Sequence, residues 1–205
     1  GKSIGALYPA VKALKEDEKI FFLTARNSGA EAAIKASMLL QAKNSALTTV
    51  ELTARRKACF CERAGEEKTF CPFSRGYYDR SMSATNELLS LGSAVKSEIE
   101  KVAEKHSVCP FELSLDTATW ADIVVGDLNY VFDPYVALKR FQDRERFILL
   151  IDEAHQLADR VKEMLSASLA LETNTLLALT SPEVGASIVN IELKIVDLAN
   201  RYLFE

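Results

Sequence analysis

The amino-acid sequence predicts an α/β fold built on a parallel β-sheet. Three short apolar runs, 20–24, 121–126 and 147–151, have the length and composition of strands, and the run 20–24 fits a buried strand of a parallel sheet. Segments with a helical spacing of apolar residues separate them, and strands that alternate with helices favour parallel pairing. The chain has 205 residues, of which 48% are hydrophobic and 26% charged, so it is large enough for one domain with a well-filled core.

The first part of the chain alternates helix and strand. Apolar residues spaced as on one face of a helix predict a helix over 2–16. Strand 20–24 follows, and Ser28 is then expected to cap a second helix over about 30–43. Residues 47–53 contain Thr and Val in the alternation typical of another strand.

Residues 55–110 depart from this alternation and are interpreted as an insertion. Seven basic and four acidic side chains between Arg55 and Arg80 give this stretch a net charge of +3, whereas the whole chain has a net charge of −4. Three of the four cysteines and several aromatic residues lie in the same stretch. A helical pattern over 86–106, broken at Gly92, leads back to the fourth cysteine, so the insertion closes on itself.

The α/β pattern then resumes. Strand 121–126 is followed by a short helix expected over 134–141, and strand 147–151 leads into Asp152 and Glu153. The C-terminal part has helical spacing and no further strand signal. We therefore expect three parts: an α/β domain at 1–54 and 111–164, a four-cysteine insertion at 55–110 and a helical segment at 165–205.

Composition and sequence ends exclude several classes of protein. The apolar run 147–151 is far shorter than the roughly 18 residues that a membrane span needs, so we expect a soluble protein without a membrane partner. The chain begins without Met or a secretion signal, so we expect it to be a fragment. Because the overall charge is negative, a nucleic-acid partner would have to bind to a local basic patch.

The first three residues match the end of a phosphate-binding loop. Gly1, Lys2 and Ser3 open a helix, as the last residues of such loops do; there the Lys neutralises phosphate charge and the hydroxyl binds Mg²⁺. Taken alone, such a triplet is usually a solvated helix start.

An acidic pair at a strand end provides a second nucleotide motif. Asp152 is a candidate ligand of Mg²⁺, Glu153 a candidate to orient or deprotonate the attacking water, and His155 a candidate to relay the state of the site. Taken alone, the four residues 152–155 fit a helix cap equally well. The Gly-Lys-Ser triplet lies ~150 residues earlier, the spacing of two nucleotide motifs on one sheet with an insertion between them, so together they predict a site for ATP with Mg²⁺.

The four cysteines, Cys59, Cys61, Cys71 and Cys109, form a candidate metal site. Intervals of 1, 9 and 37 residues separate them. Four thiolates with none left over suit an iron–sulfur cluster, and a zinc site in which His106 replaces one thiolate is the alternative. The composition alone does not distinguish the iron–sulfur cluster from the zinc site.

Basic and aromatic side chains alternate around the cysteines, a composition that fits single-stranded nucleic acid, with charges on phosphates and rings under bases. For each aromatic side chain, packing against the metal site is the stronger interpretation. The candidates for nucleic-acid binding in this stretch are Arg55, Arg56, Arg75, Tyr77 and Arg80.

Together, these motifs resemble the XPD/DinG group of iron-sulfur helicases in superfamily 2. The similarity covers nearly the whole chain in the order of that family. It is carried by Gly1-Lys2-Ser3, by Phe22-Leu23-Thr24-Ala25-Arg26, by the four cysteines with Cys71-Pro72-Phe73 and Cys109-Pro110-Phe111, by Asp122 to Pro134 with Asn129-Tyr130 and Asp133-Pro134, and by Asp152-Glu153-Ala154-His155.

The resemblance implies a RecA-like P-loop domain interrupted by a four-cysteine [4Fe-4S] domain and followed by the beginning of a helical arch domain. It favours the cluster over zinc, and it implies that a motif near Thr24-Ala25-Arg26 contacts the DNA backbone, so Arg26 joins the nucleic-acid candidates. The expected cofactors are the cluster and ATP with Mg²⁺.

The resemblance also implies a function. The full-length parent would be an ATP-dependent DNA helicase that moves 5′ to 3′ on single-stranded DNA at duplex junctions, in repair or replication, and that uses a second RecA-like domain absent from this chain. It would act at the nucleoid of a bacterium or in the nucleus of a eukaryote. The chain by itself is expected to hydrolyse no ATP. The alternative is a non-catalytic nucleic-acid-binding module with a structural zinc site.

Overall fold

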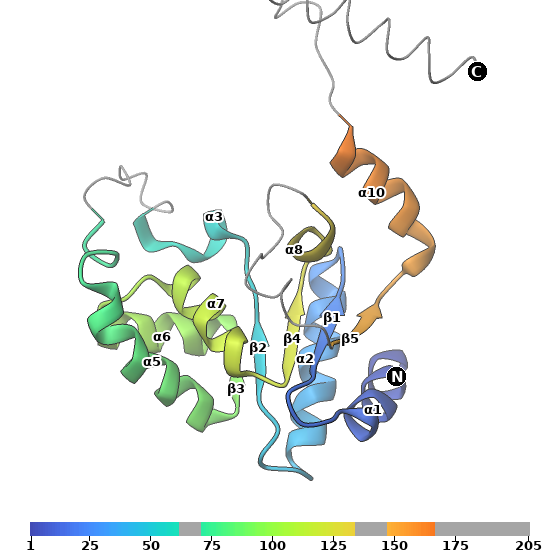
Figure 1. The fold of residues 1–205 in the computed structure, drawn as a ribbon, viewed down its shortest axis with the longest axis horizontal. Helices are drawn as coiled ribbons and strands as arrows, with labels where there is room; N and C mark the ends of the chain where they lie inside the picture. The colour runs from blue at the N-terminus through green and yellow to red at the C-terminus, as the bar shows by residue number, and fades with distance from the viewer. Residues whose placement is uncertain (62–70, 134–146, 167–205) are drawn as a thin grey trace, which may run out of the picture. The chain divides into compact units, whose positions relative to one another are not determined.

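The computed structural model describes residues 1–61, 71–133 and 147–166 (Figure 1). Residues 1–164 form one compact unit and residues 165–205 a second. The helix expected over 134–141 and nearly all of the helical segment expected over 165–205 lie outside the described residues. In the part of the chain that is described, no helix has the length and apolarity to cross a membrane.

A parallel β-sheet forms the centre of the first unit (Figure 1). The described strands are β1 (Lys19–Leu23), β2 (Thr49–Glu51), β3 (Ser93–Ala94), β4 (Ile123–Gly126) and β5 (Phe147–Ile151). They lie in the order β3-β2-β4-β1-β5, and each neighbouring pair is parallel. The predicted α/β class with a parallel sheet is therefore confirmed.

Helices cover both faces of the sheet. On one face, α1 (Lys2–Ala13) and α2 (Asn27–Gln41) pack with Ile20 and Phe22 in one hydrophobic cluster. On the other face, α5 (Tyr77–Leu91), α6 (Lys96–His106) and α7 (Pro110–Trp120) pack with Phe21 and Leu23. Successive side chains of a strand point to opposite faces, and β1 is buried on both because each of its faces is covered.

The remaining described helices are short or lie near the C-terminus. They are α3 (Arg55–Ala58), α8 (Asn129–Phe132), the 3₁₀ turn Ala154–Gln156 and α10 (Leu157–Leu165). Both α3 and α8 follow strands of the sheet, so they lie near the edge at which parallel strands end.

The segment 55–110 contributes strand β3 to the central sheet, which the sequence pattern did not predict. The predicted break at Gly92 is present: this residue has φ +72°, and a Cβ there would collide with the side-chain amide of Gln41. The Gly92 carbonyl accepts a hydrogen bond from the Thr49 amide at 2.8 Å, and β3 then pairs with β2. A strand of two residues gives no alternation in the sequence, and the helical spacing of its neighbours hides it.

Two helix ends also differ from the sequence-based expectation. The predicted Ser28 cap of α2 is wrong, because the helix begins at Asn27 with Arg26 as its N-cap residue and without a side-chain cap. Helix α1 ends at Ala13 because Leu14 is extended. The turn before α2 is held by Thr24, whose Oγ1 accepts a hydrogen bond from the Arg26 amide at 3.2 Å.

Candidate nucleotide and metal sites

The carboxyl end of β5 places Asp152 beside the end of β1. The Asp152 amide donates to the Leu23 carbonyl at 2.9 Å, which continues the pairing of the two strands by one residue. The Asp152 Oδ2 then lies 3.3 Å from the Thr24 hydroxyl. Two segments far apart in the sequence thus meet at the edge of the sheet where open α/β folds bind ligands.

Gly29 lies in the first turn of α2, directly over this contact. A Cβ at this position would collide with the Thr24 hydroxyl and would lie 2.7 Å from Asp152 Oδ2. The first turn of α2 therefore approaches the Asp152 carboxylate as closely as a backbone without a side chain allows. The partial positive charge of a helix N-terminus stabilises a nearby carboxylate.

Glu153 adopts a left-handed backbone conformation with φ +53°. Such a conformation is uncommon for a residue other than Gly, and it produces a sharp turn after β5. The His155 Nδ1 lies 3.4 Å from Glu153 Oε2, and both side chains are exposed. The 3₁₀ turn that follows has no side-chain cap, and Asp152 bonds to Thr24 instead. This geometry disfavours the interpretation of Asp152 as a helix cap.

The Gly-Lys-Ser triplet begins α1, as predicted. Gly1 is the N-cap residue, its carbonyl accepts from the Gly5 amide at 3.2 Å, and Lys2 is exposed while Ser3 is half-buried. Helix α1 packs against β5, so both nucleotide motifs lie on adjacent elements. The Ser3 hydroxyl and the Asp152 carboxylate are oxygen donors of the kind that Mg²⁺ prefers, so the donor chemistry fits this ion.

All four cysteines lie in or against the hydrophobic cluster formed by α5, α6 and α7. Cys59, Cys61 and Cys109 are buried and Cys71 is half-buried. They form two pairs of free thiols: the Sγ atoms of Cys61 and Cys71 lie 2.7 Å apart, and Cys109 is hydrogen-bonded to Cys59. In the described ranges, no group of three or more His, Cys, Asp and Glu side chains is arranged to hold a metal ion.

Two of the thiols have shifted pKa values. Burial raises the pKa of Cys109, and the neighbouring Cys59 thiol raises it further. Burial also acts to raise the pKa of Cys71, but hydrogen bonds from Cys61 and from the segment Phe73-Ser74 outweigh it, so that pKa is lowered. Metal ligation requires thiolates, and Cys71 loses its proton more readily than Cys109.

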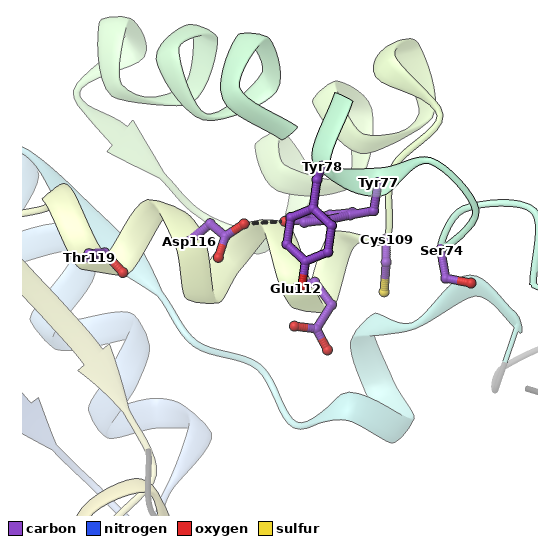
Figure 2. A pocket seen from close by; sticks show the side chains of 7 residues that line it. All are labelled: Ser74, Tyr77, Tyr78, Cys109, Glu112, Asp116 and Thr119. Atoms are coloured by element: carbon purple, nitrogen blue, oxygen red, sulfur yellow. Dashed lines mark hydrogen bonds between the residues drawn. The ribbon is translucent and has the colours of Figure 1, made fainter. Parts of the chain in front are cut away.

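A cavity of about 410 Å³ opens beside Cys109, between α5 and α7 (Figure 2). The Tyr77 hydroxyl donates to Asp116 Oδ2 at 2.7 Å across it, and burial together with this hydrogen bond raises the pKa of Tyr77. Tyr77 is only 7% exposed, whereas the adjacent Tyr78 is 88% exposed. This placement gives Tyr77 a packing role, and the ring that faces solvent belongs to Tyr78.

The loss of this hydrogen bond has a measurable consequence. Tyr77→Phe is expected to lower the free energy of unfolding by about 1–2 kcal/mol, because it removes the hydrogen bond that the buried Tyr77 hydroxyl donates to Asp116. Tyr78→Phe is the matched control and is expected to have little effect, since the Tyr78 side chain is exposed. Denaturant unfolding of both variants measures the difference; equal stabilities would contradict a structural role for the hydroxyl.

The predicted nucleic-acid residues differ in exposure. Arg26, Arg55, Arg56 and Arg75 are exposed, and the Arg55 guanidinium lies 5.6 Å from the centre of the Phe111 ring. Arg80 is half-buried, and its Nη2 donates to the carbonyls of Arg75 at 2.7 Å and Ser107 at 2.9 Å. The Arg80 side chain therefore joins two parts of the chain.

A second cavity, of about 290 Å³, lies at the carboxyl ends of β1, β2 and β4. Arg26, Lys57 and Lys96 line it together with acidic side chains. Sequence reasoning did not select Lys57 or Lys96 as site residues. Lys96 reaches this edge because β3 precedes it, so the missed strand also hid this residue.

The DEAD_2 family model matches residues 12–174, well over half of the chain. Two curated relatives are a "Regulator of telomere elongation helicase 1 homolog" from Caenorhabditis briggsae, 27% identical over 118 residues, and one from Caenorhabditis elegans, 27% identical over 132 residues. The matched regions cover 57% and 64% of this chain but 12% and 13% of those proteins. The matches thus span about an eighth of the relatives' length.

Solved structures of XPD share the fold. A structure titled XPD helicase aligns with a TM-score of 0.59 and 19% identity, over 93% of this chain and 34% of that one. A structure titled truncated XPD aligns with a TM-score of 0.56 and 20% identity, over 92% of this chain and 55% of that one. At these identities the likeness concerns the fold alone.

Proposed function

Because this chain belongs to the DEAD_2 family, we propose that it is the nucleotide-binding part of an ATP-dependent DNA helicase of the XPD type. The observation that carries the proposal is the contact of Asp152 with Thr24 at the carboxyl edge of a parallel sheet. The same sheet bears the Gly-Lys-Ser triplet on an adjacent helix. The contact between Asp152 and Thr24 supports a nucleotide site beside a turn that would contact the DNA backbone.

The roles of the nucleotide-site residues follow from their chemistry. Lys2 neutralises phosphate charge, and Ser3 and Asp152 would hold Mg²⁺, which supplies charge neutralisation of the phosphates when bound. Glu153 orients or deprotonates the attacking water, and its exposure leaves it accessible to solvent. His155 contacts Glu153 and would relay the state of the site.

For the cysteines, we propose that Cys59, Cys61, Cys71 and Cys109 hold a [4Fe-4S] cluster. Four free thiols gathered at one hydrophobic cluster support this. The zinc alternative uses His106, but the His106 Nε2 lies 2.8 Å from Glu87 Oε2 and forms an ion pair with it when protonated. That contact engages Nε2 and not Nδ1, so the metal content of the protein, and not this contact, decides between the two metal sites.

The wider organisation is also part of the proposal. Residues 1–54 and 111–164 form a RecA-like domain, 55–110 the cluster domain and 165–205 the start of an arch domain. The parent protein contains a second RecA-like domain, moves 5′ to 3′ on single-stranded DNA and opens duplex junctions during repair or replication, in the nucleus of a eukaryote or at the nucleoid of a bacterium. The test is strand separation by the full-length parent on a duplex with a 5′ single-stranded tail. Separation that needs ATP supports the proposal, whereas DNA binding without ATP hydrolysis would favour the non-catalytic zinc module.

The exposed arginines predict a salt-dependent contact with the strand. Replacing Arg55, Arg56 and Arg75 by Ala in the full-length parent is expected to weaken single-strand binding for all sequences, because these side chains would contact phosphates and not bases. The slope of log affinity against log salt concentration should fall by about 0.7 per lost contact. Fluorescence anisotropy at several salt concentrations measures both.

A matched control removes the same charge elsewhere. Lys12, Lys15 and Lys43 are exposed and lie outside the cysteine segment, so replacing these three by Ala should leave the slope unchanged. If both triple variants bind with the same affinity and slope as the parent, the arginines serve only to solvate the segment.

A further inference from the structure

The Thr24 hydroxyl lies between two parts of the proposed site. Thr24 follows β1 and is only 4% exposed. Its Oγ1 accepts from the Arg26 amide at 3.2 Å, and its single proton has two acceptors within reach. These are the Arg26 carbonyl at 3.4 Å and Asp152 Oδ2 at 3.3 Å.

We propose that Thr24 is a positioning residue. It couples the turn at Arg26, which would contact single-stranded DNA, to the carboxylate of Asp152. Through it, nucleotide binding and single-strand binding each alter the affinity for the other. This inference rests on the proposed function, since it assigns a regulation to the same site.

The two contacts in which the Thr24 hydroxyl is the donor have nearly equal lengths, 3.4 Å to the Arg26 carbonyl and 3.3 Å to Asp152 Oδ2. Both are longer than the usual O–H···O distance of about 2.7–2.8 Å, so the hydroxyl has two weak alternative acceptors. A carboxylate whose charge is shared with a cation is a weaker acceptor. The Thr24 proton then moves toward the Arg26 carbonyl, which adds to the bond from the Arg26 amide and orders the turn.

The packing around Thr24 makes this contact rigid. Gly29 leaves no space in which the hydroxyl and the Asp152 carboxylate could separate toward α2. The hydrogen bond that the Asp152 amide donates to the Leu23 carbonyl fixes the backbone on the other side. A change at Asp152 therefore reaches Thr24 directly, and Arg26 is two residues further along the chain, exposed to solvent.

Coupling of this kind is reciprocal for binding free energies. It is measured as the ratio of single-strand dissociation constants without and with saturating ATP and Mg²⁺. The Glu153→Gln variant of the full-length parent is the suitable background, because it retains Asp152 and Thr24 while hydrolysis is blocked. We expect ATP to tighten single-strand binding about fivefold or more in this background.

Removal of the Thr24 hydroxyl should abolish the coupling, so that ATP no longer changes the affinity for single-stranded DNA. Thr24→Val keeps the shape of the side chain and is expected to bring the ratio to within about twofold of one, since one hydrogen bond contributes about a factor of 2–12. Thr24→Ser retains the hydroxyl and should restore the ratio. Gly29→Ala, whose methyl group displaces both Thr24 and Asp152, should also lower it.

Thr49→Val is the matched control. Thr49 lies on the neighbouring strand β2, is 3% exposed, and its hydroxyl has no hydrogen-bond partner among the described residues. This variant should keep the full ratio. An unchanged ratio in Thr24→Val would overturn the coupling while leaving the proposed function intact, and so would a parent that binds both ligands with a ratio of one. A parent that binds neither ATP nor DNA would overturn the proposed function itself, and the coupling with it.

Discussion

Glu153→Gln in the full-length parent is expected to reduce ATP turnover by about a hundredfold or more, because general-base catalysis contributes factors of about 10²–10⁴. Lys2→Ala is expected to have an effect of similar size, since it removes a cation that stabilises phosphate charge in the transition state. Neither side chain supports the core: Lys2 and Glu153 are both exposed. The measurement is steady-state phosphate release with DNA present.

Matched substitutions at other exposed positions show whether a loss of turnover comes from the nucleotide site or from the change in net charge. Glu163→Gln on α10 and Lys12→Ala on α1 change the same kinds of side chain at exposed positions, and turnover should remain near that of the parent. Thermal melting of all four variants should agree with the parent within a few degrees. Turnover retained in Glu153→Gln or Lys2→Ala would contradict the assigned roles.

Replacing any one of the four cysteines by Ser is expected to remove the iron and the broad visible absorbance of anaerobically purified protein. The buried thiols Cys59, Cys61 and Cys109 lie in the hydrophobic cluster under α5, α6 and α7, so loss of the metal should also loosen the segment between Arg55 and Cys109. Limited proteolysis should then cleave this segment several times faster. Iron and sulfide analysis measures the cluster directly.

His106→Ala distinguishes the two metal sites. In the cluster account it breaks only the contact with Glu87 and leaves the iron content unchanged. In the zinc account it removes a ligand. One zinc and no iron per chain in anaerobic protein, lost again in His106→Ala, would contradict the cluster.

The strands with long apolar runs could be predicted from the sequence. Strand β5 was predicted at 147–151, and its described bounds agree, because five consecutive apolar residues before an acidic pair leave little choice of register. Helix α7 was missed, although Pro110 at its first turn and Glu112 are ordinary helix-start signals. Its pattern was obscured because α7 is buried on a wide face and its polar residues Ser114 and Thr117 lie inside.

The candidate nucleotide residues could be selected from the sequence for a different reason, and their roles stay predictions. Their chemistry is local, since Lys2 and Asp152 each follow directly from a short motif at an element end. The contact of Thr24 with Asp152 and the need for Gly29 were not predictable, because both depend on which strands are neighbours. Strand order is set by packing between distant segments, and no spacing within β1 or β5 reveals that they pair.

The role of each aromatic and basic side chain in 71–80 also required the structure. Tyr77 and Tyr78 are adjacent and chemically identical, but one is buried against Asp116 and the other faces solvent. Which of the two rings is buried depends on which face of the helix packs against its neighbours. Because α5 begins at Tyr77, where the pattern indicated no helix, the sequence could not assign the two rings to different environments.

The most direct test of the central claim is the rate of Mg²⁺-dependent ATP hydrolysis by the full-length parent, measured with and without single-stranded DNA. The account predicts hydrolysis that rises at least severalfold when single-stranded DNA is added and that falls by about a hundredfold or more in Glu153→Gln. Hydrolysis that is absent under both conditions, from protein that is folded and loaded with its metal, would contradict the assignment of this chain to a DNA-driven motor.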